Sequence, residues 1–108
     1  MSPQTTTGSG STFQDKFQRL SSEWKEKSRY MSNVAQMAVL PSYLGIIGIG
    51  PDAIPLILEE LRREPDHWFW ALEAITQENP VPVEAAGNVK LMTQAWVDWG
   101  IQKGYLSS

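Results

Sequence analysis

Residues 43–76 read YLGIIGIGPDAIPLILEELRREPDHWFWALEAIT, and this stretch predicts more of the fold than any other part of the chain. Gly-x-Gly-Pro at 48–51 and Glu-Pro-Asp at 64–66 divide it into three segments, because glycine and proline favour turns and helix ends. In the middle segment, apolar residues recur at helical spacing, at Ile54, Ile57, Leu58 and Leu61. The third segment opens on a dense aromatic run, HWFW at 67–70. The stretch therefore predicts three short helices that pack together.

The same helical spacing continues on both sides of this stretch. It predicts helices over residues 12–30, 41–48, 51–63 and 67–76, and a last helix from Glu84 or Asn88 to about Gln102. No segment alternates apolar and polar residues with the period of a strand. We therefore predict an all-α fold, a small bundle of about five helices with Leu58 and Leu72 at the centre of its core. Asp66 is the predicted N-cap of the fourth helix.

The N-terminal residues 1–11, MSPQTTTGSGS, differ in composition from the rest of the chain. They carry no charge and have one sizeable apolar side chain, that of Met1. Such a segment cannot bury enough surface to offset the entropy lost on ordering it. We predict a disordered tail over residues 1–11 and a single all-α domain over residues 12–108.

Charge and composition narrow the classes of function. The net charge of −3 argues against nucleic acid as the main partner. Residues 1–40 hold five basic and three acidic residues, so the first helix could lie on the acidic remainder of the chain or on an acidic partner. The sequence has no cysteine, no membrane-spanning apolar run and no signal-peptide pattern. We expect a cytoplasmic location and no membrane partner.

The helices predicted over 51–63 and 67–76 together resemble one HEAT repeat, a helical hairpin of about 40 residues. The matching residues are Ala53, Pro55, Leu56, Leu58 and Leu61 on the first helix and Trp70, Ala71, Leu72, Ala74 and Ile75 on the second. HEAT repeats normally stack in arrays, whereas this chain has one clear copy. The resemblance therefore implies a HEAT-like hairpin flanked by the other helices, without an extended concave surface.

A second resemblance is to a widespread family of small, uncharacterised bacterial proteins. It rests on PDHWFWAL at 65–72 and AWVDWG at 95–100, and it covers about two thirds of the chain. Gln77 stands where members of that family tend to have glycine. The resemblance implies the helix boundaries and a bacterial origin, and it implies no activity.

The reactive residues form no catalytic or metal-binding motif. His67 is the only histidine, and its neighbour Asp66 would not face it on a helix, so a role at the helix end is favoured over catalysis. Without cysteine a metal site would need converging carboxylates, and we interpret the acidic group Glu59, Glu60, Glu64 and Asp66 as a solvated helix end. The glycines at 45, 48 and 50 lack the spacing of a phosphate loop. We expect no enzyme, no cofactor and no metal ion.

The candidate interaction residues are four tryptophans and the histidine: Trp68, Trp70, Trp96, Trp99 and His67. Trp68 and Trp70 would point about 200° apart on a helix, so at least one is expected to be partly exposed. Exposed tryptophans are typical of binding hot spots. The alternative is that all four fill the core of the bundle.

These observations favour interaction over catalysis. We predict a small non-enzymatic protein–protein interaction module, either self-associating or an accessory, antitoxin-like or immunity-like partner of another bacterial protein. The alternative hypothesis is a homo-oligomeric regulatory module that binds a small ligand in an aromatic pocket.

Overall fold

The computed structural model describes residues 8–107, with side chains from residue 13 onward. Over this range, five helices of eight or more residues carry the fold: α2 (Gly8–Ser28), α4 (Pro41–Ile49), α5 (Ile54–Arg63), α6 (Phe69–Thr76) and α7 (Val89–Lys103). A short helix, α3 (Val34–Met37), and two 3₁₀ turns, η1 (Gly50–Ala53) and η2 (Val83–Ala85), lie between them, and residues 8–107 contain no strand. The prediction of a small all-α bundle is confirmed.

The first helix begins earlier than predicted. α2 starts at Gly8 rather than Thr12, so its first turn includes the end of the predicted N-terminal tail. Residues 1–7 of that tail lie outside the described residues, and their disorder stays a prediction.

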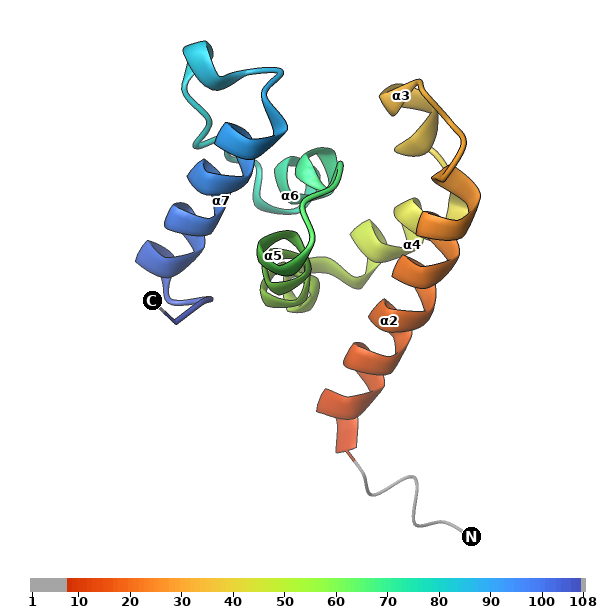
Figure 1. The fold of residues 1–108 in the computed structure, drawn as a ribbon. Coiled ribbons are helices and arrows are strands. Elements are labelled where there is room, and N and C mark those ends of the chain that lie inside the picture. The colour runs from red at the N-terminus through yellow and green to blue at the C-terminus, as the bar shows by residue number, and fades with distance from the viewer. Residues whose placement is uncertain (1–7, 108) are drawn as a thin grey trace, which may run out of the picture.

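The helices pack as a chain of pairs. α2 lies along α4, α4 packs on α6, and α5 packs mainly on α7. In Figure 1, α2 and α4 form one side of the molecule, α7 forms the other, and α5 and α6 lie between them. α5 and α6, the two helices of the predicted HEAT-like hairpin, contact each other, but each packs more extensively on another helix. The core is therefore shared among all five helices.

An aromatic cluster joins α2, α4 and the start of α6. The ring of Trp68 lies 4.5 Å from Trp24, 5.9 Å from Phe17 and 6.0 Å from Tyr43, measured between centroids. All four side chains are buried. Aromatic side chains each bury roughly 150–250 Å² and prefer such tilted or offset contacts. The indole Nε1 of Trp24 also donates to the Met37 carbonyl at 2.9 Å, which holds α3 against α2.

On the other side of the molecule, α7 approaches α5 closely at Gly100. A Cβ atom on Gly100 would lie only 2.7 Å from Cδ1 of Leu58 and 3.3 Å from Cδ1 of Leu106. Leu58 is fully buried, as is Leu72 on α6, so their predicted place in the core is confirmed. Glycine at position 100 is therefore a packing requirement of the α5–α7 contact.

The predicted helix over 51–63 is divided in two. Gly50 has φ 83° and ψ −154°, a conformation open essentially to glycine alone, and the chain then makes the 3₁₀ turn η1 before α5 begins at Ile54. Pro55 consequently lies in the first turn of α5, where its missing N–H breaks no helical hydrogen bond.

The predicted N-cap of the fourth helix is wrong. α6 begins at Phe69, and the Asp66 carboxylate accepts instead from the backbone N–H of His67, at 2.7 Å. The cap comes from α4: the Tyr43 hydroxyl accepts from the N–H of Ala71, the third residue of α6, at 2.9 Å and donates to the His67 carbonyl at 3.0 Å. Burial raises the pKa of Tyr43, so the hydroxyl keeps its proton.

We expect Tyr43→Phe to lower the free energy of unfolding by about 1–3 kcal/mol, because it leaves the Ala71 N–H and the His67 carbonyl without this partner. Urea denaturation measures the effect. Tyr30→Phe is the matched control, because Tyr30 is 89% exposed and should change stability by no more than about 0.5 kcal/mol. Equal stability of Tyr43→Phe and the wild type would show that the hydroxyl does not cap α6.

Gln77 ends α6 in a left-handed conformation. Gln77 is the C-cap of α6 and has φ 60°, the left-handed conformation that glycine adopts without strain. Its side-chain Nε2 donates to the Ala74 carbonyl at 2.8 Å, which ties the side chain to the last turn of the helix. A glycine at this position would suit the same turn.

Candidate functional site

An apolar groove of about 330 Å³ lies among α3, the start of α6 and the start of α7. Val34 of α3 forms one wall, and Val89 and Met92 of α7 form another. Gly87 and three aromatic side chains, those of His67, Phe69 and Trp70, complete the lining. The groove thus brings together segments that are far apart in the sequence, and it contains two of the five predicted interaction residues.

The two tryptophans of the aromatic run have opposite surroundings. Trp70 is 49% exposed, whereas Trp68 has no exposed surface. Phe69, Ala71 and Leu72 turn one side of α6 into the core, which leaves Trp70 on the other side. The prediction that at least one of the pair is partly exposed is confirmed, and Trp70 is the exposed one.

Trp96 and Trp99 are core residues. Both are buried, and their rings make an edge-to-face contact at 5.2 Å. The Trp99 ring also stacks on Tyr105 at 5.6 Å, and its Nε1 donates to the Glu78 carboxylate at 3.0 Å. The i, i+3 spacing turns Trp96 and Trp99 toward the same packed surface, so both are covered by their own chain. Trp68 is covered in the same way by other residues of the chain. Of the four candidate tryptophans, Trp70 alone offers a large surface to a partner.

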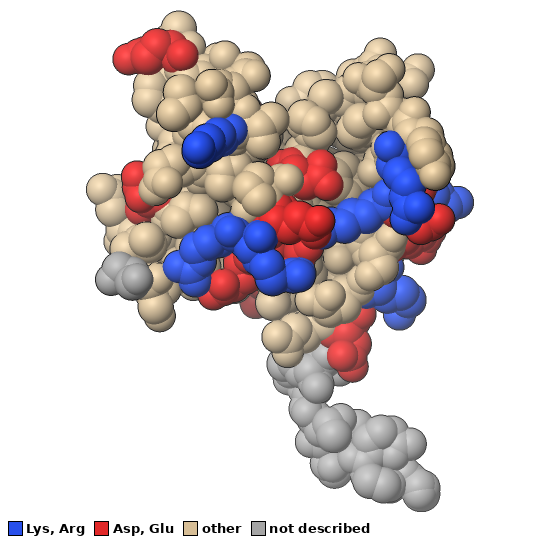
Figure 2. Space-filling view, viewed as in Figure 1, with Lys and Arg blue, Asp and Glu red and all other residues tan. Residues whose placement is uncertain are grey.

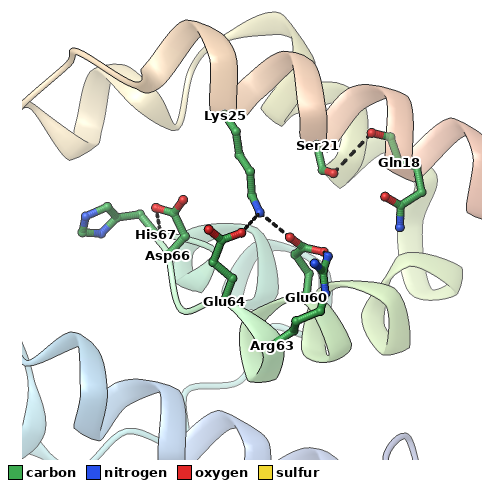
Figure 3. A network of polar contacts seen from close by, with 8 residues as sticks. All are labelled: Gln18, Ser21, Lys25, Glu60, Arg63, Glu64, Asp66 and His67. Carbon is green, nitrogen blue, oxygen red and sulfur yellow. Dashed lines mark hydrogen bonds and ion pairs between the residues drawn. The ribbon is translucent and has the colours of Figure 1, made fainter.

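His67 lines the groove beside Phe69 and Trp70. Its backbone binds Asp66 and Tyr43, and Figure 3 shows its imidazole ring turned away from Lys25 and Glu64. No described residue makes a hydrogen bond to the ring nitrogens that meets the usual geometry. The ring is therefore a wall of the groove, and within the described part of the chain its nitrogens have no hydrogen-bond partner.

The α3 wall of the groove belongs to a long uncharged segment. Residues 30–51 contain no Asp, Glu, Lys, Arg or His. Figure 2 shows the charged side chains of the visible face gathered mainly in a band across the middle of the molecule, with largely uncharged surface above it. Val39, just after α3, is 62% exposed, and Leu91 in the first turn of α7 is 49% exposed. The elements around the groove thus carry exposed apolar side chains.

A second cluster is polar and ties α2 to α5 (Figure 3). The Lys25 ammonium donates to the carboxylates of Glu60 and Glu64, the latter at 2.8 Å, and Arg63 donates to Glu60. Partial burial opposes the charge on Lys25, but its two carboxylate partners outweigh burial and raise its pKa above 10.5. The hydrogen bond from Lys25 lowers the pKa of Glu64 below its ordinary value. The basic first helix therefore does lie on acidic residues of its own chain.

This polar cluster has a structural role. Glu60 is only 4% exposed, so its interpretation as part of a solvated helix end is wrong. A buried carboxylate needs counter-charges, and Lys25 and Arg63 supply them from two helices. Among the described residues, no group of three or more histidine or acidic side chains is placed to hold a metal ion.

Comparison with protein-family models, curated proteins and solved structures found no match for this chain. Within the described residues, no helix combines the length and the apolar character needed to cross a membrane. The function is therefore inferred from the geometry of the chain itself.

Proposed function

We propose that this protein is a small non-enzymatic interaction module that binds another protein through the groove beside Trp70. The observation that carries the proposal is the half-exposed indole of Trp70 at the edge of an apolar groove. A tryptophan offers a large contact area and loses little conformational entropy on binding, which is why it is enriched among hot spots.

The surroundings of Trp70 support the same function. The centres of protein interfaces are depleted in charge and enriched in aromatic residues and methionine. Here the groove combines Trp70, Phe69 and Met92 with an uncharged α3 segment. Single apolar residues scattered over a surface are common in soluble proteins, whereas apolar side chains gathered in one groove are typical of a protein-binding site.

The partner is either a second copy of this chain or another protein. The small size of the domain and the resemblance to a bacterial family favour an accessory protein that acts on one partner, as antitoxins and immunity proteins do. The comparison with antitoxins and immunity proteins rests on the small size of the domain and on the family resemblance, and it does not depend on the geometry of the groove.

We expect Trp70→Ala to weaken self-association or partner binding by more than about 1 kcal/mol, which is roughly fivefold in the dissociation constant. Sedimentation equilibrium measures self-association, and quantitative pulldown from the native host measures capture of a partner. Tyr105→Ala is the control, because Tyr105 is an aromatic of similar exposure, 39%, at the opposite end of α7. Far-UV circular dichroism checks that each variant is folded. Equal association by Trp70→Ala and the wild type would contradict the proposal.

The lining of the groove also favours a second candidate function, a regulatory module that binds a small ligand. Ligand pockets are mostly apolar and aromatic with a few polar groups, and their volumes begin at about 300 Å³. The groove meets both conditions, with the His67 ring as its polar group. A metabolite that quenches tryptophan fluorescence in the wild type and not in Trp70→Ala would favour this function over protein binding.

A further inference from the structure

A second pocket, of about 290 Å³, lies at the end of α7, whereas the groove beside Trp70 lies at the start of that helix. Ile54 of α5 and Ile75 of α6 contribute apolar lining. Unlike the groove, this pocket also contains a carboxylate, that of Glu78, together with aromatic rings from α7 and the segment that follows it. The pocket therefore combines a negative charge with apolar and aromatic surface.

The Glu78 carboxylate is held in a fixed orientation. Its Oε1 accepts from the Trp99 Nε1–H at 3.0 Å, and the backbone N–H of Glu78 donates to the Thr76 hydroxyl at 3.1 Å. The second oxygen, Oε2, lies 3.9 Å from the Lys103 ammonium, which is too far for a hydrogen bond. The Lys103 side chain is half exposed, and such surface ion pairs contribute little. The carboxylate is therefore oriented but only weakly neutralised.

Tyr105 places an aromatic ring in the same pocket. Gly104 has φ 87°, and this left-handed residue turns the chain back so that the Tyr105 N–H donates to the Gly100 carbonyl at 2.8 Å. The Tyr105 ring then stacks on Trp99, with 5.6 Å between centroids, and Tyr105 remains 39% exposed. The face of an aromatic ring attracts a cation within about 6 Å of its centroid. A cation in this pocket could therefore contact both a ring and a carboxylate.

We propose that this pocket binds a small molecule that carries a guanidinium group on an alkyl chain, and that the guanidinium displaces Lys103 from Glu78. A planar guanidinium donates two hydrogen bonds to a carboxylate and stacks on an aromatic ring, whereas an ammonium acts as a point charge. The alkyl chain would lie against Ile54 and Ile75. The volume of the pocket is close to the lower end of the range for small-ligand sites, about 300 Å³.

The charge of the surrounding chain also favours a cation. Residues 41–108 contain nine acidic and four basic residues, so their field attracts positive ligands. Because the pocket and the groove beside Trp70 share no lining residue, this inference does not rest on the proposed function.

The experiment titrates the whole chain with butylguanidinium and follows the Trp99 indole N–H and the Tyr105 ring by NMR. Three probes of similar length are compared: butylammonium, which replaces the planar group with a point charge, neutral pentanamide and anionic pentanoate. We expect saturable shifts of both signals with butylguanidinium, weaker binding of butylammonium, and no saturable shift with the other two. The absence of saturable shifts with butylguanidinium, or equal affinity for any of the other three probes, would overturn the inference.

Four variants locate the binding. Glu78→Gln removes the charge but keeps an oxygen for the Trp99 N–H, and it should weaken binding of butylguanidinium about tenfold or more. Tyr105→Leu should weaken it about two- to fivefold, because the ring is lost. Lys103→Met should strengthen binding, because it removes the competing cation. Glu84→Gln is the control, since Glu84 is an exposed acid outside the pocket, and it should leave the affinity unchanged.

The unfolding midpoint of each variant is compared with that of the wild type. Unchanged affinity in folded Glu78→Gln would overturn the inference. Lys103→Met keeps the test decisive if Glu78→Gln does not fold, because weaker or unchanged binding by Lys103→Met would also overturn it.

Two further measurements separate a small molecule from a protein partner. Acetyl-arginine amide presents the same group on a peptide backbone, and we expect it to bind no more tightly than butylguanidinium. Binding more than about tenfold tighter would assign the pocket to a peptide and overturn the small-molecule inference. Glu78→Gln should leave unchanged the association that Trp70→Ala weakens, and a loss of that association would place the pocket in the protein interface and overturn the inference as well. Failure of the Trp70 proposal alone would leave the probe results unaffected.

Discussion

Trp68→Ala is expected to lower the free energy of unfolding by about 3–5 kcal/mol, the usual range for truncating a buried tryptophan. Trp68 has no exposed surface and contacts the rings of Phe17, Trp24 and Tyr43. Its removal would leave a cavity where α2, α4 and α6 meet. Because small domains have a total stability of about 5–15 kcal/mol, this loss would bring the protein close to unfolding at room temperature.

Trp70→Ala is the matched control, because it makes the same chemical change two residues away. About half of the Trp70 side chain is already in water, so its loss should cost about 1–2 kcal/mol. Chemical denaturation of both variants gives the comparison, with the denaturant dependence of each checked for two-state behaviour. An equal or larger loss in Trp70→Ala would show that the burial of the two indoles has been assigned the wrong way round.

The second large effect is expected at Leu58, the centre of the contact between α5 and α7. Leu58→Ala should cost about 2–5 kcal/mol, because the side chain is fully buried and its removal leaves a cavity. Gly100→Ala should cost about 1–3 kcal/mol for the opposite reason, since its Cβ would lie 2.7 Å from Leu58. Urea denaturation measures both.

The double variant tests whether the two residues share one contact. Leu58→Ala removes the nearest atom that obstructs a methyl group at position 100, so the double variant should lose less stability than the two single variants lose together. Residues in contact show coupling energies of about 0.5–3 kcal/mol. Strict additivity would mean that α7 does not pack on Leu58 at Gly100. An effect below about 1 kcal/mol for Leu58→Ala alone would show that the buried stripe of α5 is misassigned.

Much of the local structure could be predicted from the order of residues. The i, i+3, i+4 spacing at Ile54, Ile57, Leu58 and Leu61 predicts a helix with one buried side, and all four residues are buried. Asn88 is the N-cap of α7, and its side-chain oxygen accepts from the Leu91 N–H. Gly104 is the C-cap of α7 and has the left-handed conformation. These features depend on neighbours within a few positions, so a linear pattern contains them.

The candidate site could be predicted only in part. The 200° divergence of Trp68 and Trp70 indicates that one indole is exposed, but α2 and α4 decide which one, because their rings cover Trp68. The groove needs α3, α6 and α7 together, and no local pattern links Val34 to Met92. Trp96 and Trp99, predicted as candidate contacts, are covered by packing within the chain.

The linear sequence was enough to predict the helical class, the buried side of α5 and one exposed tryptophan, because each follows from the period of the helix. Only the packing of the helices determines which side chains form hydrogen bonds and ion pairs between different helices. Tyr43 caps α6 in place of Asp66, and Lys25 compensates the buried charge of Glu60. A helical period depends on residues that are close together in the sequence. A hydrogen bond or an ion pair between helices depends instead on how the whole core packs.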